Sequence, residues 1–135
     1  MKGRDERGQT LVLAAMVMAF LFVPLGVYVI DSGLVEAGYA QLGETLQASA
    51  EDGASIIDEN AYRQSGAKIV TLDSSLARST ADRSLRVSSL PGLDSWTISV
   101  TGQTVVVTAR LKVHLFAAGA VTLTETKTAR LAYGQ

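Results

Sequence analysis

Residues 10–30 of the chain read TLVLAAMVMAFLFVPLGVYVI and contain no charged side chain. As an α-helix, these 21 residues rise about 31 Å, which matches the roughly 30 Å hydrocarbon core of a bilayer. A helix also satisfies its backbone amides within the segment, as lipid requires. Pro24 removes one of these amide donors, so we expect a kink there. The stretch predicts one transmembrane helix over residues 10–30.

Two other interpretations of this stretch are a buried helix of a soluble protein and a cleaved secretory signal. The rest of the chain is too short to surround such a helix on all sides. The apolar region of a secretory signal is usually about 7–15 residues long and ends in a small-x-small site. Here the run is longer, and the nearest candidate site, Val35-Glu36-Ala37, lies beyond the charged Asp31. We therefore expect an uncleaved anchor.

The charged residues on either side of the stretch predict its orientation. Lys2, Arg4 and Arg7 precede it, and the next basic residue after it is Arg63. Basic flanks stay on the cytoplasmic side of a membrane span. We therefore expect residues 1–9 to form a cytoplasmic leader and residues 31–135 to lie outside the cytoplasm.

The composition of the 135 residues argues against several classes of function. A formal net charge of −1 gives no basic surface for nucleic acid, and the absence of cysteine excludes disulfides and thiolate chemistry. The single histidine, His114, is expected on the outward face of a strand. The adjacent pairs Glu51-Asp52 and Asp58-Glu59 diverge on a helix and read as a solvated face. We expect no catalytic activity, no cofactor, no metal site and no small-molecule substrate.

Residues 31–60 are expected to continue the membrane helix as an amphipathic stem. One stripe of this helix alternates four- and three-residue spacings and consists of Val35, Tyr39, Leu42, Leu46, Ser49, Gly53 and Ile56. A glycine inside a helix costs about 1 kcal/mol relative to alanine, and close approach of a neighbouring helix is one reason to keep it. The alternative is a flexible, frayed stem. The candidates for helix packing are Gly33, Gly38, Tyr39, Leu42, Leu46 and Gly53.

Residues 61–135 predict a small α+β head. Residues 67–72 read as a short strand or an extended segment, and Asp73 is the expected N-cap of a helix over residues 74–88. Strands with alternating apolar residues follow, separated by turns at residues 101–103 and 117–120. We expect the helix to pack on a three- to four-stranded antiparallel sheet. The buried face of this helix is predicted to comprise Leu76, Ala77, Ala81, Leu85 and Val87.

The last strand poses a question of orientation. If its threonine row, residues 122 to 128 in steps of two, faces solvent, the opposite parity points Glu125 and Lys127 inward. A bulge or an edge position would resolve this conflict. Trp96 lies on the buried parity of the first strand and is interpreted as a core residue.

The formal charge differs between segments. It is +1 in residues 1–9, −7 in residues 31–59 and +5 in residues 60–135, which together give the net charge of −1. We hypothesise that acidic stems attract basic heads in neighbouring copies or in a partner. Two solvated surfaces that merely differ in sign are the alternative.

Several short motifs occur in a characteristic order along the chain. The charged leader Arg4–Gln9 contains an Arg-Gly pair, the span ends in Val29–Asp31, and an alanine-rich acidic stretch occupies Leu46–Ala54. The chain ends in alternating Val/Thr strands and a Thr-Ala-Arg at Thr128–Arg130. In their order and spacing these features resemble the Tad-type (tight adherence, Flp) pilus-assembly proteins of the TadE/TadG-like group, with Glu51 in the place of the usual aspartate.

The resemblance implies a pilin-like fold and a role as a membrane-anchored minor pilin or pseudopilin of a Tad-type pilus assembly or secretion machine. It places the protein in a bacterial cytoplasmic membrane, or in an extracellular filament, with other pilin-like or pilus-assembly proteins or copies of itself as partners. Two alternatives stay open. The chain could itself polymerise into a filament, or it could be a membrane-tethered binding module unrelated to pili.

The leader leads to a prediction about processing. Members of the family that a prepilin peptidase cuts after the leader glycine carry a glutamate at the fifth mature position. A cut between Gly8 and Gln9 would place Leu13 there, and residues 9–30 contain no glutamate. We therefore expect the chain to keep its leader, which an intact-mass measurement of the native protein tests. A mature N-terminus at Gln9 would contradict this.

Overall fold

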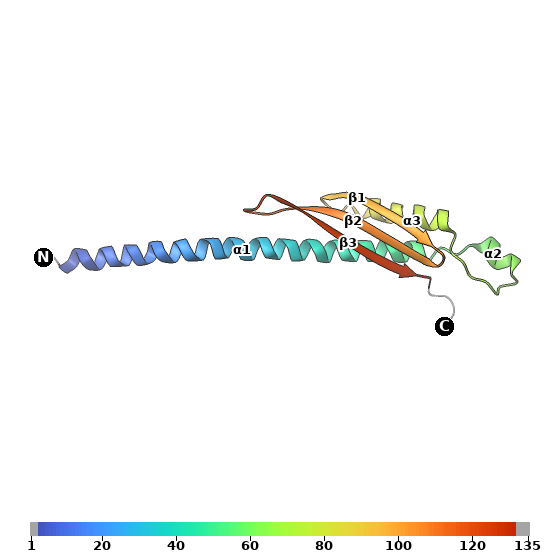
Figure 1. Ribbon diagram of the computed structural model, residues 1–135, viewed down its shortest axis with the longest axis horizontal. Helices are drawn as coiled ribbons and strands as arrows, with labels where there is room; N and C mark the ends of the chain where they lie inside the picture. Colours follow the sequence, from blue (N-terminus) through green and yellow to red (C-terminus); the bar gives the residue numbers. More distant parts are fainter. Residues whose placement is uncertain (1–2, 132–135) are drawn as a thin grey trace.

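The computed structural model describes residues 3–131. Residues 1–2 of the expected leader and 132–135 of the expected head lie outside the described residues. A long N-terminal helix extends well beyond a small head that contains a three-stranded antiparallel sheet (Figure 1). The predicted α+β class is confirmed at this level. The elements are α1 (Gly3–Ala54), α2 (Glu59–Gln64), α3 (Ser74–Ser88), β1 (Leu93–Thr101), β2 (Thr104–His114) and β3 (Ala120–Arg130).

Helix α1 is 52 residues long and joins the predicted span and stem without a break. Pro24 lies inside it, but Figure 1 shows no sharp bend along α1, so the expected kink is not seen. Proline fixes a φ that suits a helix, but it withdraws one donor and its ring crowds the carbonyl of the residue four positions earlier. In α1 this local disruption does not change the direction of the helix axis visibly.

Helix α1 ends at Ala54 and not at residue 60 as expected. Two local interactions favour the end of the helix at this point. The Asp58 carboxylate accepts from the backbone N–H groups of Asn60 and Ala61, both at 3.0 Å, and so caps the separate helix α2. The Asp58 N–H donates to the Thr71 carbonyl at 2.8 Å, which holds this segment extended beside residues 71–72.

The C-terminal part of α1 forms the centre of the head. Leu42, Leu46 and Ala50 are fully buried. They belong to one apolar cluster with Val105, Val107, Ala109 and Leu111 of β2 and with Leu123 and Ala129 of β3. The middle of the expected stripe, from Leu42 to Gly53, is therefore a buried face, whereas Val35 and Ile56 are half-buried and Tyr39 is exposed. The alternative of a frayed stem does not describe this helix. The C-terminal part of α1 therefore packs mainly against the chain's own sheet.

Helix α3 follows the predicted range of residues 74–88. The Asp73 carboxylate accepts from the N–H groups of Ser75 and Leu76 at 3.1 and 3.0 Å. These bonds, the one from Leu76 above all, lower the pKa of Asp73. Only the narrow stripe Ala77, Ala81 and Leu85 is buried.

Two residues of the predicted buried face of α3 are exposed. Leu76 is 51% and Val87 72% exposed, so placing them in the core was wrong. The physical reason is that α1, and not α3, covers β2 and β3, while α3 contacts α1 and β1. A helix at this margin buries one stripe of small residues rather than a broad face. Leu76 instead lines an open groove beside α2 with Ile56, Ile57, Tyr62 and Val70.

The sheet has the order β1-β2-β3, and its strands pair antiparallel. The predicted turn at residues 101–103 connects β1 and β2, and the pairing of β2 with β3 is continuous from Thr104 to His114. Residues 67–72 add no strand, because only Leu72 pairs there, with Ile57 in an isolated bridge. Gly92 lies directly before β1 with a φ of +85°, and a Cβ at this position would collide with the Lys112 carbonyl oxygen.

Gly53 sets the distance between α1 and α3 and generates a prediction. A Cβ there would lie 3.0 Å from the Ala77 carbonyl oxygen and 3.2 Å from the Ala81 Cβ. We expect Gly53→Val to lower the free energy of unfolding by about 1–3 kcal/mol, as overpacking does. Urea unfolding of the full chain in mild detergent, followed by near-ultraviolet circular dichroism of Trp96, measures this. Gly33→Val is the matched control, because nothing lies within 4 Å of the corresponding Cβ. Equal stabilities would contradict the role of Gly53.

Candidate functional site

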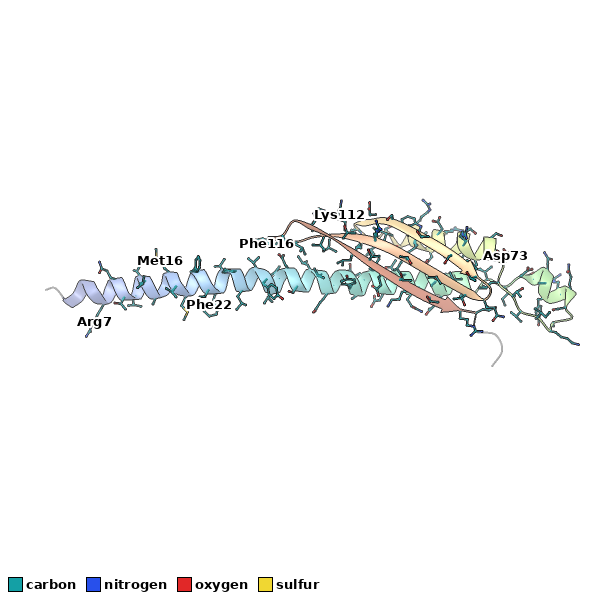
Figure 2. The ribbon with its side chains drawn as sticks, in the orientation of Figure 1. Arg7, Met16, Phe22, Asp73, Lys112 and Phe116 are labelled. Atoms are coloured by element: carbon teal, nitrogen blue, oxygen red, sulfur yellow. The ribbon has the colours of Figure 1, made fainter. Side chains whose placement is uncertain are left out.

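The N-terminal part of α1 is an apolar helix that no other part of the described chain covers. Its large side chains between Leu11 and Ile30 are exposed, Phe20 by as much as 82%. This is the one helix in residues 3–131 that is long and apolar enough to cross a membrane. Exposed contiguous apolar surface of this size marks a site of interaction with lipid or with another protein. Figure 2 shows Met16 and Phe22 pointing outward from the bare helix.

The end of this apolar surface is joined to the head by one acidic side chain. Asp31 accepts from the backbone N–H of Phe116 at 2.6 Å and of Ala117 at 3.3 Å. The two segments are 85 residues apart in the sequence, yet Figure 2 places Phe116 beside α1 at the near end of the sheet. Hydrogen bonds to a carboxylate are stronger than those between neutral groups. We call Asp31 together with residues 115–119 the exit junction.

Most of the predicted helix-packing residues make their contacts within the chain's own fold. Gly38, Leu42, Leu46 and Gly53 are buried. A Cβ on Gly38 would lie 2.9 Å from side-chain atoms of Leu123 and Val113. The glycine therefore allows the sheet to pack closely against α1. Gly53 does adjoin a neighbouring helix, but that helix is α3 of the same chain.

The two remaining candidates are free to meet another molecule. Gly33 is exposed with nothing within 4 Å of where its Cβ would lie, and Tyr39 is 44% exposed. Gly8 and Gln9 also lie exposed within α1. The structure therefore brings Gly38, Leu42, Leu46 and Gly53 together in the core of the head and leaves Gly33 and Tyr39 at its margin.

The orientation of Glu125 and Lys127 is resolved by an edge position. Both side chains point toward α1, and the Glu125 Oε1 lies 2.9 Å from the Lys127 Nζ. They fit because Gly43 leaves room, since a Cβ there would lie 3.2 Å from the Glu125 Oε1. Gly43 is not among the helix-packing candidates predicted above. The signal that could have found it is the inward parity of two charged residues, which requires a gap in the opposing helix.

Trp96 ties α3 to β1. Its Nε1–H donates to the Asp82 Oδ1 at 2.8 Å, and the Arg86 Nε donates to the Asp82 Oδ2 at 2.7 Å. The Arg86 guanidinium also lies 5.4 Å from the centre of the Trp96 ring. The hydrogen bond from Arg86, followed by that from Trp96, lowers the pKa of Asp82, and its bond with Asp82 raises the pKa of Arg86. Trp96 is only half-buried, so it is a boundary residue of the core.

The acidic groups of the predicted stem are largely engaged within the chain. Asp52 accepts from the Ser84 Oγ at 2.6 Å, Asp58 caps α2, and Glu59 lies 3.6 Å from the Arg63 guanidinium. Asp31 accepts from Phe116 and Ala117 within the exit junction. Of these partners only Arg63 is charged, so the hydrogen bonds fix the positions of the other carboxylates and leave their negative charge in place.

The described residues contain no group of three or more histidine, cysteine, aspartate or glutamate side chains placed to hold a metal ion. His114 is exposed on β2, as predicted. The geometry instead offers surfaces: an uncovered apolar helix, an exit junction and an open groove beside α2. Such features serve contacts with lipid or protein.

Comparisons with known proteins give no family for the chain. No protein-family profile matches it, and neither the curated proteins nor the solved structures contain a match. The function therefore has to be inferred from the uncovered helix, the exit junction and the motifs of the sequence.

We call Asp82, Arg86 and Trp96 the Asp82 cluster. This cluster predicts a contribution to the stability of the head that depends on pH. Because folding lowers the pKa of Asp82, the cluster stabilises the head above the carboxyl's ordinary pKa of 3.8 and loses this contribution as the pH falls through the lower folded value. We expect Asp82→Asn to destabilise the head at pH 7. The difference should shrink at an acidic pH below the lowered pKa of Asp82, where the native carboxylate is also protonated.

Urea unfolding of the full chain in detergent, measured by circular dichroism at both pH values, checks this prediction. Asp94→Asn is the matched control, because Asp94 is an exposed carboxylate on the neighbouring strand β1. A loss of stability in Asp82→Asn that is equally large at both pH values would show that the charge of Asp82 is not its cause.

Proposed function

We propose that this protein is a membrane-anchored minor pilin or pseudopilin of a Tad-type pilus assembly or secretion machine, and that it acts through helix–helix and head–head contacts. The observation that carries the proposal is the division of α1. Its residues 11–30 are uncovered and apolar, whereas Leu42, Leu46 and Ala50 of the same helix are fully buried in the head. The motif order described above supports the choice of this family.

The division of α1 suits a protein whose function is to hold its head at a defined place relative to its anchor. A continuous helix of 52 residues is about 78 Å long. Because the head folds around its C-terminal part, any movement of the anchor moves the head with it. A pilus subunit or assembly factor needs this coupling, since its helix must pack beside other helices while its head is presented outside the membrane.

The occupied glycines limit where neighbouring helices can pack. The buried Gly38, Leu42 and Leu46 contact the chain's own sheet and cannot also contact a second molecule. Lateral contacts therefore fall on the uncovered part of α1 and on Gly33 and Tyr39 near its margin. Small residues in the span, such as Ala14, Ala15 and Gly26, would allow close approach there.

The basic leader supports an orientation with the N-terminus in the cytoplasm and the head outside it. Arg7 is the last basic residue before the span, and the head supplies the next one, Arg63. In this orientation the head of a bacterial protein faces the envelope, where pilus proteins assemble. Trypsin treatment of intact spheroplasts would then cleave the head and spare the leader.

The proposal predicts where the native protein is found. We expect it in the membrane fraction with pilus proteins co-purifying.

Leu21→Arg should reduce the retention of the protein in the membrane after carbonate extraction, because an arginine at the centre of a span costs about 2.5–3.5 kcal/mol on insertion scales. Val87→Arg is the matched control, since Val87 is an exposed apolar residue of the head.

Each other outcome points to a different function. Recovery mainly in sheared extracellular filaments would identify a subunit that polymerises. Recovery in membranes without any pilus protein would contradict the proposal and favour a tethered binding module. Equal membrane retention of Leu21→Arg and the native chain would contradict the anchor itself.

A further inference from the structure

We propose that the tip of the β2–β3 hairpin, residues 115–119, is a second membrane contact that inserts among the lipid headgroups beside α1. This inference rests on the proposed anchor and deepens it, because it fixes how the head sits on the membrane. The tip reads Leu115-Phe116-Ala117-Ala118-Gly119 and carries no charge. Its aromatic side chain, Phe116, is 76% exposed.

The position of the tip follows from its hydrogen bonds with Asp31. Asp31 is the first residue after the uncharged stretch of residues 10–30, and its carboxylate accepts from Phe116 and Ala117. Helical side chains lean toward the N-terminus of their helix. The tip is therefore held at the level of the last turn of the apolar stretch, where a span that starts at Thr10 leaves the lipid. In Figure 1 the hairpin points back along α1 toward this part of the helix.

The backbone of the tip is prepared for an environment with little water. The Leu115 N–H donates to the Gly119 carbonyl at 2.6 Å, and the N–H groups of Phe116 and Ala117 donate to Asp31. An unpaired backbone donor is costly to move out of water. Three successive donors of the loop have partners, so the apolar side chains beside them can enter the interface at lower cost.

The residues that lead to the tip suit the headgroup region. Lys112 and His114 are exposed on the outward face of β2, three and one residues before Leu115. Strand residues advance about 3.3 Å each, so the Lys112 backbone lies about 10 Å above the start of the tip. A lysine at that height can reach lipid phosphates while the aromatic ring lies deeper, an arrangement typical of interfacial segments.

Two contacts define the orientation of the head, whereas one does not. A single helix leaves the whole molecule free to tilt in the membrane. With the hairpin tip also in the interface, that tilt is restricted, and α2 faces away from the membrane at the opposite end of the head (Figure 1). The open groove beside α2 is then presented at the point farthest from the lipid, where a neighbouring head or assembly partner can reach it.

The chain contains no cysteine, so single nitroxide labels can be attached at chosen sites of the full-length protein. The test compares Ala118→Cys, in the tip with Phe116 intact, with Val17→Cys in the span and Val87→Cys on α3. Each labelled chain is reconstituted in vesicles of phosphatidylcholine and phosphatidylglycerol. Power-saturation spectroscopy with oxygen and a water-soluble nickel chelate reports whether the label is in lipid or in water.

We expect the ratio of oxygen to nickel accessibility at Ala118 to be at least roughly threefold higher than at Val87, as for an interfacial segment. Adding Phe116→Asp should move the Ala118 label toward the Val87 value, while the Val17 label stays in lipid. Circular dichroism of Phe116→Asp confirms that the head is still folded. Phe116 is exposed, so this substitution leaves the core unchanged.

Three results would overturn the inference, and they are distinguishable. A tip label in water with the Val17 label in lipid would leave the anchor intact and refute the second contact. Both labels in water would refute the proposed anchor. A tip label shielded from both reagents, with spin–spin broadening that dilution by unlabelled chain removes, would assign Phe116 to contact with a second copy.

Discussion

The burial of Leu42, Leu46 and Ala50 beneath the sheet is the interaction on which the rest of this molecule depends. These side chains belong to the same helix as the uncovered residues 11–30. Within residues 3–131 the sheet has one apolar face and no second sheet to cover it, so without α1 its inner face would meet water. Since one continuous helix provides both the core and the uncovered apolar surface, the head and that surface cannot move independently.

Close approach to α1 depends on small residues at three levels. Gly38 admits the Leu123 and Val113 side chains, Gly43 admits the Glu125–Lys127 pair, and Gly53 admits α3. Each glycine weakens the isolated helix by about 1 kcal/mol. The sheet and α3 compensate for this by contacts that larger residues would block. These three glycines of the stem are therefore explained by the chain's own fold, whereas Gly33 stays exposed with nothing within 4 Å of its Cβ position.

Local signals sufficed to predict some elements and not others. The range of α3 followed from the Asp73 cap, and the strands followed from alternation and from the turn at residues 101–103. The stripe through Leu42 and Leu46 predicted a buried face, but what covers a face is a tertiary property that spacing does not specify. For the same reason Leu76 and Val87 were placed in a core that α1 already fills. The contact between Asp31 and Phe116 joins residues 85 apart and has no local signature.

The exit junction links the two environments that α1 serves. Asp31 stands where the uncharged stretch ends, and a carboxylate there would usually be kept in water by its charge. Its hydrogen bonds with Phe116 and Ala117 give that charge two backbone donors and bring an apolar loop to the same level. A shift of α1 by one turn along its axis, about 5.4 Å, would break both bonds. The junction therefore adds to the register that the buried face of α1 sets between the apolar stretch and the head. If α1 is the proposed anchor, an assembly that drew it out of lipid would have to carry the hairpin tip with it.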